Sequence, residues 1–514
     1  MKRAAYVVAF VALGCSSGGS NSPGGSGGAS NGGSTSASGG GTALGGAANS
    51  GGARVANGGS ASGGAPANSG GAGVSGGAPV NGGAPATAGS DAGGTAGNSQ
   101  AGGGGMAGAL LDPKLCPTQP DGVVARLDAA LRPPGAAIAS TATRPQLSQE
   151  QADARFTILK ALARGGDFSV NAGTITYARD DNWDPLSASI GDVTKVVPGY
   201  TVALDGSGTH TSIQAAITEA IYLATCPRVY IRIMPGTYRE TVVVPAKTSA
   251  PPLTLYGIDS DASKTVIVRG NSAAGTEAGE PSTISASATF TNSLPSGFQA
   301  KNLTIANDYA EGKYPGDDQS AVALLNQGDR AAYENVRIVG NRFALYVKST
   351  AVTQVSRTYF RDCYVEGDEE FIAGRGTAVF DRSTVHSLGS RKPEAGIIAA
   401  PSTVLTNPYG FLFINSVFSG ETSASGVFLG RQWFEGAKKD AVGKMVVRNS
   451  QLGAHVRRSD PWAAYPGRVT DKDASGSSPI VLYGSDDYFA PANAPNEREA
   501  YLGEYANDGP GAVP

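Results

Sequence analysis

The stretch VEGDEEFIAGRG, from Val365 to Gly376, places four carboxylates in front of an apolar pair. Successive side chains of a strand alternate in direction, so Glu369 and Glu370 should face opposite ways. The pattern indicates that one of them is directed into a functional site. A carboxylate held there can act as a nucleophile or as an acid or base.

The remaining polar residues give little support for metal or nucleic-acid chemistry. The acidic pairs at 317–318 and 486–487 could bind calcium, but solvated loop acids are the simpler interpretation. A net charge of −3 over 514 residues argues against a nucleic-acid partner. The histidines lie far apart and lack metal-ligand spacing, so no metal or cofactor is predicted: His210, His386 and His455.

Cysteines and aromatic residues leave alternatives open. A Cys116–Cys226 bridge would tie the start of the folded region to its body, and Cys363 is expected to be a buried thiol. Four aromatic side chains could stack on sugar rings, although each could equally serve ordinary packing: Tyr309, Tyr314, Trp433 and Trp462.

The first part of the chain is not expected to fold. Residues 1–15 have the basic start and short apolar run of a signal peptide, and Ala12-Leu13-Gly14-Cys15 resembles a bacterial lipobox with Cys15 as the lipidated residue. The alternative is plain secretion with an unmodified Cys15. Residues 16–110 consist almost wholly of small and polar residues, which predicts a flexible tether.

The folded region should begin with an N-terminal extension, residues 111–200, that contains one helix. Ser148 and Gln151 form a capping box for a helix predicted over Gln149–Arg164. A second helix is expected from Thr211 or Ser212 onward, at the start of the main domain, which covers residues 201–514.

Short strands then replace the helical pattern. Runs at 229–233, 241–244, 253–256 and 265–268 are separated by Gly, Asn or Asp. Polar corners recur at intervals of 19 to 34 residues, at Asn302, Asn335, Asp362, Asp381, Asn415 and Asn449. Such spacing predicts an all-β parallel solenoid with a few short helices at its N-terminal end. A β-sandwich is less favoured, because tight Asn-Gly or Asp-Gly hairpins are few.

Several motifs in order resemble the pectin methylesterase family, whose members are right-handed parallel β-helices. The resemblance covers about 250 residues and includes VALDGSGTHTSIQAAI, MPGTYRETVVVP, SAVALLNQGDRAAYENV, EGDEEFIAG and FLGRQWF. It implies hydrolysis of galacturonate methyl esters. In this chemistry an Asp nucleophile forms an acyl-enzyme, a second Asp acts as acid and base, and two glutamines donate hydrogen bonds to the oxyanion.

Carrying these roles across places Glu370 at the nucleophile position, with Phe371 beside it in the motif. Arg431 and Trp433 match the arginine and the tryptophan that hold the nucleophile and floor the sugar cleft. The acid–base position is occupied by Phe343, and one oxyanion position by Arg342.

The other oxyanion glutamine aligns on Ser320, with Gln319 one residue earlier. Gln319 would project to the opposite side of a regular strand, so it could serve as a donor only if a bulge shifts it. An added methylene moves the nucleophile by about 1 Å, which can cost about 100-fold in rate. Loss of an acid–base group costs about 10²–10⁴-fold, and loss of an oxyanion donor costs about 10²–10³-fold.

Two functions are therefore carried forward. The first is an extracellular carbohydrate esterase that hydrolyses methyl esters of a pectin-like, esterified acidic polysaccharide. The second is a polysaccharide-binding β-helix that has lost turnover. A polygalacturonase or pectate lyase is disfavoured. The Asp pairs and the Gly-His-Gly segment that mark a polygalacturonase are absent, and the predicted strands carry no acidic calcium cluster. The resemblance to the family implies a monomer. The lipobox-like sequence predicts attachment to the outer membrane through Cys15, with secretion as the alternative.

Overall fold

The computed structural model describes residues 115–141, 143–171, 174–280, 282–390, 396–404, 407–433, 435, 441, 443–463 and 501–512. The predicted signal peptide, Cys15 and tether lie outside these residues, as do Asp486 and Asp487. Within the described ranges, no helix has both the length and the apolar character needed to traverse a membrane.

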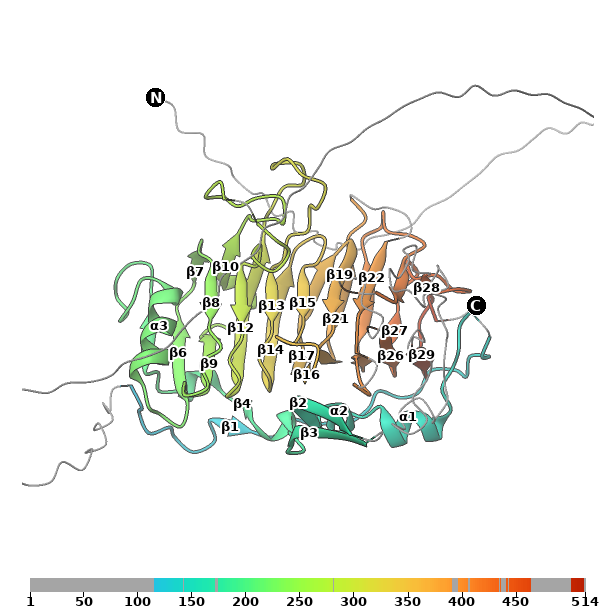
Figure 1. Cartoon of the computed structure of the whole chain (residues 1–514), viewed down its shortest axis with the longest axis horizontal. Helices are drawn as coiled ribbons and strands as arrows, with labels where there is room; N and C mark the ends of the chain where they lie inside the picture. Colours follow the sequence, from blue (N-terminus) through green and yellow to red (C-terminus); the bar gives the residue numbers. More distant parts are fainter. Residues whose placement is uncertain are drawn as a thin grey trace, which may run out of the picture. The chain divides into compact units, whose positions relative to one another are not determined.

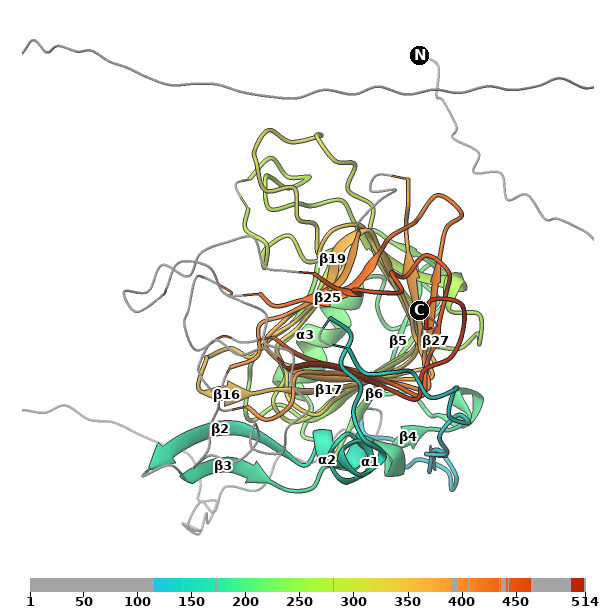
Figure 2. The same cartoon turned by 90° about the vertical axis from the view of Figure 1, so that its right-hand side faces the viewer.

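The chain winds into a right-handed coil of three parallel sheets, as the solenoid prediction expected. Figure 2 looks along the coil and shows the sheets enclosing a common interior. We call them the first, second and third faces, in the order in which the chain meets them. Two long strands, β12 and β14, bend from the first face into the second.

The first and second faces follow one another around each turn of the coil. The strands of the first face are β5 (Tyr200–Val202), β6 (Val229–Ile233), β9 (Leu253–Gly257), β12 (Phe298–Asn307), β14 (Ala331–Val339), β17 (Arg357–Arg361), β20 (Thr377–Asp381), β23 (Phe411–Ile414), β26 (Lys444–Arg448) and β29 (Tyr501–Tyr505). The second face continues β12 and β14 and adds β7 (Gly236–Tyr238), β10 (Thr265–Arg269), β18 (Tyr364–Gly367), β21 (Thr384–Ser387), β24 (Val417–Gly420) and β27 (Gln451–Leu452).

The third face is a sheet of eight strands that positions the candidate site (Figure 1). Its short strands run side by side, so residues in register form rows along the length of the coil. These strands are β8 (Val242–Val244), β11 (Phe290–Asn292), β13 (Leu324–Asn326), β15 (Leu345–Val347), β19 (Glu369–Gly374), β22 (Ile397–Pro401), β25 (Phe428–Arg431) and β28 (Trp462–Ala463).

Rows of buried side chains fill the interior of the coil. Phe360, Phe380 and Phe413 occupy matching positions on β17, β20 and β23, and their rings stack with centroids 4.8 and 4.4 Å apart. Each turn therefore covers the apolar surface of the turn before it, which is the source of stability in a solenoid. Trp462 also packs into this interior, so its role is packing.

Most of the predicted polar corners are positions where the backbone bends between the first and second faces. Asn302, Asn335, Asn415 and Asn449 have φ between 48° and 57°, the left-handed region that asparagine tolerates better than most residues. In one turn the prediction is off by a residue: Arg382 occupies the bend with φ 52°, and Asp381 ends the preceding strand.

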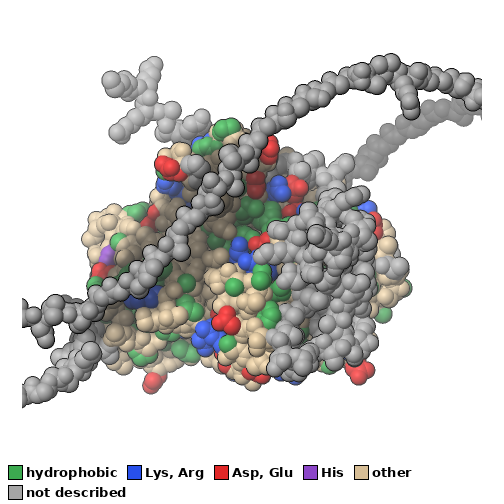
Figure 3. All heavy atoms as spheres, viewed as in Figure 1, with side chains coloured by type: hydrophobic (Ala, Val, Ile, Leu, Met, Phe, Trp, Pro, Cys, Tyr) green, Lys and Arg blue, Asp and Glu red, His purple; other side chains and the backbone are tan. Residues whose placement is uncertain are grey.

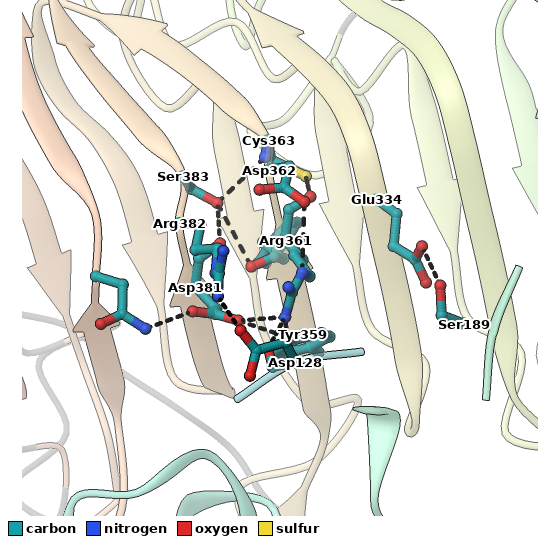
Figure 4. A network of polar contacts seen from close by, with 12 residues as sticks. Asp128, Ser189, Glu334, Tyr359, Arg361, Asp362, Cys363, Asp381, Arg382 and Ser383 are labelled. Carbon is teal, nitrogen blue, oxygen red and sulfur yellow. Dashed lines mark hydrogen bonds and ion pairs between the residues drawn. The ribbon is translucent and has the colours of Figure 1, made fainter. Parts of the chain in front are cut away.

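Asp381 instead accepts hydrogen bonds within the first face, as Figure 4 shows. The Tyr359 hydroxyl donates to its carboxylate at 2.8 Å and Arg361 Nη1 donates at 2.9 Å. Asn415 Nδ2 also donates to the Asp381 carboxylate, at 3.0 Å. Burial raises the pKa of Asp381 in spite of these three hydrogen bonds. The same view shows Ser189, in the N-terminal extension, donating to Glu334 on β14 at 2.6 Å.

The extension contains more structure than the single predicted helix. Its capping box is confirmed, but helix α1 (Gln149–Arg155) ends at Phe156, and Thr157 caps a separate short helix, α2 (Ile158–Ala161). Arg164, where the predicted helix ended, begins β2 (Arg164–Asn171), which pairs with β3 (Thr174–Asp180). The remaining elements are β1 (Val124–Ala125), η1 (Pro185–Ser187), β4 (Ser189–Ile190) and η2 (Val193–Lys195).

Apolar side chains of the extension pack on the outer side of the first face. Phe156, Ile158 and Leu162 contact a patch of the coil that includes Tyr359 and Leu412. Figure 1 shows the extension running along the lower edge of the coil.

The predicted second helix is confirmed as α3 (Ile213–Leu223), which is capped by Ser212. The predicted Cys116–Cys226 disulfide is also present, with its Cα atoms 5.4 Å apart, and Cys363 is a buried thiol.

Candidate active site

An apolar strip runs along the outer side of the third face. Leu325, Tyr346, Ala373 and Ala400 are register partners on β13, β15, β19 and β22, and they form one buried cluster that also contains Phe343. Residues one position away, such as Leu324 and Ile372, point into the interior. Figure 3 shows this face of the molecule, where hydrophobic side chains lie in a hollow with acidic and basic side chains near them.

Arg431, at the end of β25, brings a positive charge to the site. Its Nε donates to Glu370 Oε1 at 2.5 Å, and its Nη2 contacts the same oxygen. The side chains are 12% and 4% exposed, so the pair is largely removed from water. The structure therefore brings together the two residues on which the sequence hypothesis depended, while their catalytic role stays a prediction.

The Glu370 side chain owes its direction to a β-bulge. Strand β19 takes three steps from Glu369 to Ile372 where β22 takes two, from Ile397 to Ala399. The additional residue interrupts the regular alternation of side chains. Glu370 has a φ of 50°, and its carboxylate reaches Arg431.

The same bulge corrects the role predicted for Phe371. Both Phe371 and Ile372 point into the interior, and Phe371 is fully buried in the main core. Its ring packs against Gly367, where an added Cβ would lie 2.2 Å from the Phe371 Cβ. Phe371 is therefore a core residue and does not face the apolar strip.

Three aromatic rings cover part of the strip. Phe343, Tyr346 and Trp433 contact one another, with ring centroids between 5.4 and 6.1 Å apart. Phe343 is buried, so the position of the family acid contributes apolar surface and no proton donor. The Arg342 guanidinium lies 5.5 Å from the centre of the Phe343 ring.

Gln319 and Ser320, which lie beside and at the position of the second oxyanion glutamine, are both engaged in local contacts. Gln319 holds the loop around it: its Oε1 accepts from the Tyr309 hydroxyl and the Gly312 amide, and its Nε2 donates to backbone carbonyls. Ser320 is fully buried, and its hydroxyl donates to Asp318 at 2.6 Å. The Tyr309 ring stacks on Tyr314, so its contacts are those of loop packing.

Glu435 is a residue of this region that the sequence analysis missed. It accepts from the Tyr346 hydroxyl at 2.5 Å, from Arg375 Nη1 at 2.6 Å and from Lys348 Nζ at 3.3 Å. The Ser402 hydroxyl donates to it at 3.3 Å. Burial raises the pKa of Glu435, but Tyr346, Arg375 and Lys348 outweigh burial, and the pKa falls below its usual value.

The order of the strands in the sequence contains a clue to the partners of Glu435. Lys348, Arg375 and Ser402 each come directly after a strand of the third face, so the parallel register brings them together. Glu435 lies two residues beyond Trp433, and its contacts tie that segment to three strands. We therefore assign Glu435 to the framework of the site. Among the residues that the structure describes, no group of three His, Cys, Asp or Glu side chains forms a metal site.

Comparison with known proteins agrees with this geometry. The family model described as pectinesterase matches residues 199–472. A pectinesterase of Ralstonia solanacearum is 41% identical over 355 residues, which cover 63% of this chain and 85% of the relative. Pectinesterase B of Dickeya dadantii is 33% identical and covers 66% and 85%.

The same agreement extends to solved structures. The structure of rice weevil pectin methyl esterase superimposes with a TM-score of 0.57 at 26% identity, covering 73% of this chain and 99% of the weevil protein. The sequence motifs, the three-sided coil and the family match point to one conclusion. The chain belongs to the pectinesterase family of carboxylic ester hydrolases.

Proposed function

We propose that this protein hydrolyses methyl esters of an extracellular, pectin-like acidic polysaccharide. The observation that carries the proposal is the contact between Glu370 and Arg431 beside the apolar strip of the third face. The rings of Tyr346 and Trp433 offer apolar surface to a sugar chain. The names of the relatives, pectinesterase and pectin methyl esterase, support this substrate class.

In the proposed reaction, Glu370 attacks the carbonyl carbon of the ester. A bond forms between the Glu370 oxygen and that carbon, and the bond from the carbon to the methoxy oxygen breaks. The departing oxygen takes up a proton to leave as methanol, and water then cleaves the acyl-enzyme to release the acid. Because Phe343 cannot donate a proton, we assign that proton to water, which predicts slow turnover.

Arg431 has a positioning role in this scheme. Its guanidinium fixes the Glu370 carboxylate, and the two nitrogens on one oxygen leave the second oxygen to the ester. Arg342, the nearest cation in sequence to Phe343, is assigned to the oxyanion or to a neighbouring galacturonate carboxylate.

The experiment measures methanol release from highly methylated pectin by the full-length chain. We expect release above background that disappears in Glu370→Gln. The matched control is Glu369→Gln, which removes the neighbouring carboxylate and should retain activity. Release that is equal in the wild type and Glu370→Gln would exclude the proposed nucleophile.

A second function has a specific observation in its favour. Phe343 is packed into the apolar strip and has no proton to donate. Gln319 and Ser320 are hydrogen-bonded to residues of their own loop, so these positions offer no oxyanion donor. A protein that binds the polysaccharide without turnover would show pectin binding and no methanol. If the double variant Arg342→Gln/Phe343→Asp then gained activity, the fold would be an esterase scaffold with a disabled site.

We further propose that the chain acts as a monomer held at the outer membrane by a lipid on Cys15. The resemblance of Ala12-Leu13-Gly14-Cys15 to a lipobox supports this placement. Incorporation of labelled palmitate that is lost in Cys15→Ala would support the anchor. Secretion of an unlabelled wild-type protein would contradict it.

A further inference from the structure

A cavity of about 760 Å³ lies between the N-terminal extension and the coil, away from the third face. Its lining comes from α1, α2 and the β2–β3 hairpin on one side and from residues 407–409 of the coil on the other. Figure 2 shows α2, β2 and β3 grouped beside the first face. The family match begins at residue 199, so most of this lining lies outside it.

Two tyrosines give the cavity aromatic surface. Tyr177 projects from β3 and Tyr409 from the segment that leads into β23. Phe156 packs edge-on against Tyr409, and Phe168 packs against Tyr177, so each tyrosine ring contacts a second aromatic ring. Burial raises the pKa of Tyr177 to about 12, and its hydroxyl stays a neutral hydrogen-bonding group at ordinary pH.

The backbone beneath Tyr409 is firmly held. Asn407 accepts from the Tyr409 amide at 3.2 Å, and the Thr377 hydroxyl donates to the Tyr409 carbonyl at 2.8 Å. Lys444 Nζ, buried under this segment, donates to the Asn407 carbonyl at 2.5 Å. These hydrogen bonds hold the cavity wall to the coil.

The lining contains two cations, Lys160 and Arg164, and two carboxylates, Asp180 and Asp184, and both carboxylates have ion-pair partners. Arg164 pairs with Asp180 at 3.3 Å, and Asp184 pairs with Arg126 at 3.0 Å. Lys160, on α2, also lines the cavity, and within the described part of the chain no carboxylate lies at ion-pair distance from it. Because both carboxylates are held in ion pairs, the ammonium of Lys160 favours a ligand that carries negative charge.

We propose that this cavity is a second saccharide-binding site, for a short stretch of acidic polysaccharide with unesterified carboxylates. The tyrosine rings take the apolar face of a sugar, their hydroxyls bond to its hydroxyl groups, and Lys160 receives a carboxylate. The cavity volume is in the range of small-ligand sites. The choice of ligand rests on the proposed function, because ester hydrolysis converts neutral sugar units into acidic ones.

The physical consequence is retention on the product. A chain that binds de-esterified polymer at a site separate from the third face stays attached after each hydrolysis, which raises the effective concentration of remaining esters. The site therefore affects action on long polymer and leaves action on short esters unchanged.

The test titrates an unesterified galacturonate tetramer into the full-length chain carrying Trp433→Ala, which weakens binding at the third face. In this background Lys160→Ala and Tyr177→Ala should each reduce the affinity about tenfold. The exposed Lys195→Ala and Tyr222→Ala serve as matched controls and should bind as the parent does. Lys160 is exposed, so its variant probes binding without removing packing.

Unchanged affinity in both Lys160→Ala and Tyr177→Ala would overturn the proposal. Equal binding of the fully methyl-esterified tetramer would overturn the assignment of an acidic ligand. Methanol release is measured separately. A chain that binds the tetramer at Lys160 and releases no methanol would disprove the proposed esterase and leave this site standing.

Discussion

At the scale of single residues, the candidate nucleophile depends on an unusual backbone. Glu370 has a left-handed φ of 50° within a bulge, a conformation that costs a residue other than glycine about 1–3 kcal/mol. Its carboxylate is also buried against Arg431. Both features cost stability, and they persist because the neighbouring strands fix the chain on either side of the bulge.

Glu435 should act by positioning the segment that carries Trp433. Glu435→Gln keeps the side-chain shape but removes the charge that Arg375 and Lys348 contact. We expect a loss of about 1–3 kcal/mol in the free energy of unfolding, and an increase in KM for pectin that exceeds the change in kcat. Urea unfolding and steady-state methanol release measure the two effects.

The matched control is Glu366→Gln on the second face, where Glu366 also accepts from a tyrosine hydroxyl, that of Tyr364, at 2.7 Å. It should leave KM unchanged. A decrease in kcat alone for Glu435→Gln would indicate a direct part in the chemistry and contradict a positioning role.

His455 should make folding sensitive to mild acid. It is 7% exposed, and burial, with a smaller contribution from His386, lowers its pKa to about 4. In the unfolded chain its pKa is about 6.5. The unfolded state therefore binds a proton that the folded state does not, and stability falls as the pH decreases from about 6.5 to about 4.

The loss over that window is about 3 kcal/mol. Urea unfolding at a series of pH values, compared between the wild type and His455→Gln, should show a flatter dependence in the variant. Parallel curves for the wild type and His455→Gln would show that His455 does not contribute.

At the scale of elements, the bends between the first and second faces place most of their strain on residues that tolerate it. Asparagine occupies four bends, at Asn302, Asn335, Asn415 and Asn449, and its amide can also bond along the coil. The Asn335 amide, for example, donates to Asn302 Oδ1 at 2.8 Å. The bend after Asn335 carries Asp362, with φ 50°, and the following bend carries Arg382, which departs from this pattern.

Arg382→Asn should therefore stabilise the coil. Asparagine adopts the left-handed region at lower cost than arginine, while the exposed ion pair of Arg382 with Asp128 contributes little. We expect a gain of about 0.5–1 kcal/mol in the free energy of unfolding, measured in urea. Arg382→Ala keeps the strain and loses the ion pair, so a variant with asparagine that is no more stable than the alanine variant would contradict the explanation.

Sequence patterns predicted the strands well where the side chains alternate regularly between the two sides of a strand. The β6 run at 229–233 is confirmed residue for residue, because its alternating side chains and flanking polar residues obey the period of a strand. Regular alternation fails at β19, where the bulge turns Phe371 inward. A bulge changes register through hydrogen bonding with a neighbouring strand, which the local sequence does not encode.

The contacts of the site were harder to predict than its strands. The motifs located Glu370 and Arg431, because each lies in a short run of residues within a strand that resembles a motif of the family. Glu435 was missed, since its partners are separated from it by 33 to 89 residues and meet only after the coil forms. The early end of α1 at Phe156 likewise reflects packing of that ring on the coil.

At the scale of the whole molecule, the extension acts as a strap along the coil. It begins at the Cys116–Cys226 disulfide next to α3, and it reaches the last turn, where Gly135 donates to the Ala506 carbonyl and Arg144 pairs with Glu504 at 2.9 Å. It then returns along the first face to β4 and enters β5. Both ends of the coil are therefore held by one segment.

The disulfide closes this strap, so its removal should weaken the whole fold. The bridge joins residues 110 positions apart, and cross-links that close long loops restrict the unfolded chain most. The double variant Cys116→Ser/Cys226→Ser should lose about 2–5 kcal/mol in the free energy of unfolding. The wild type unfolded in urea with dithiothreitol should lose a similar amount, while reductant should have no effect on the variant. Unfolding of the variant and the oxidised wild type at the same urea concentration would contradict this prediction. The noncovalent contacts of the strap with the last turn, which are the same in both proteins, would then be sufficient to hold it.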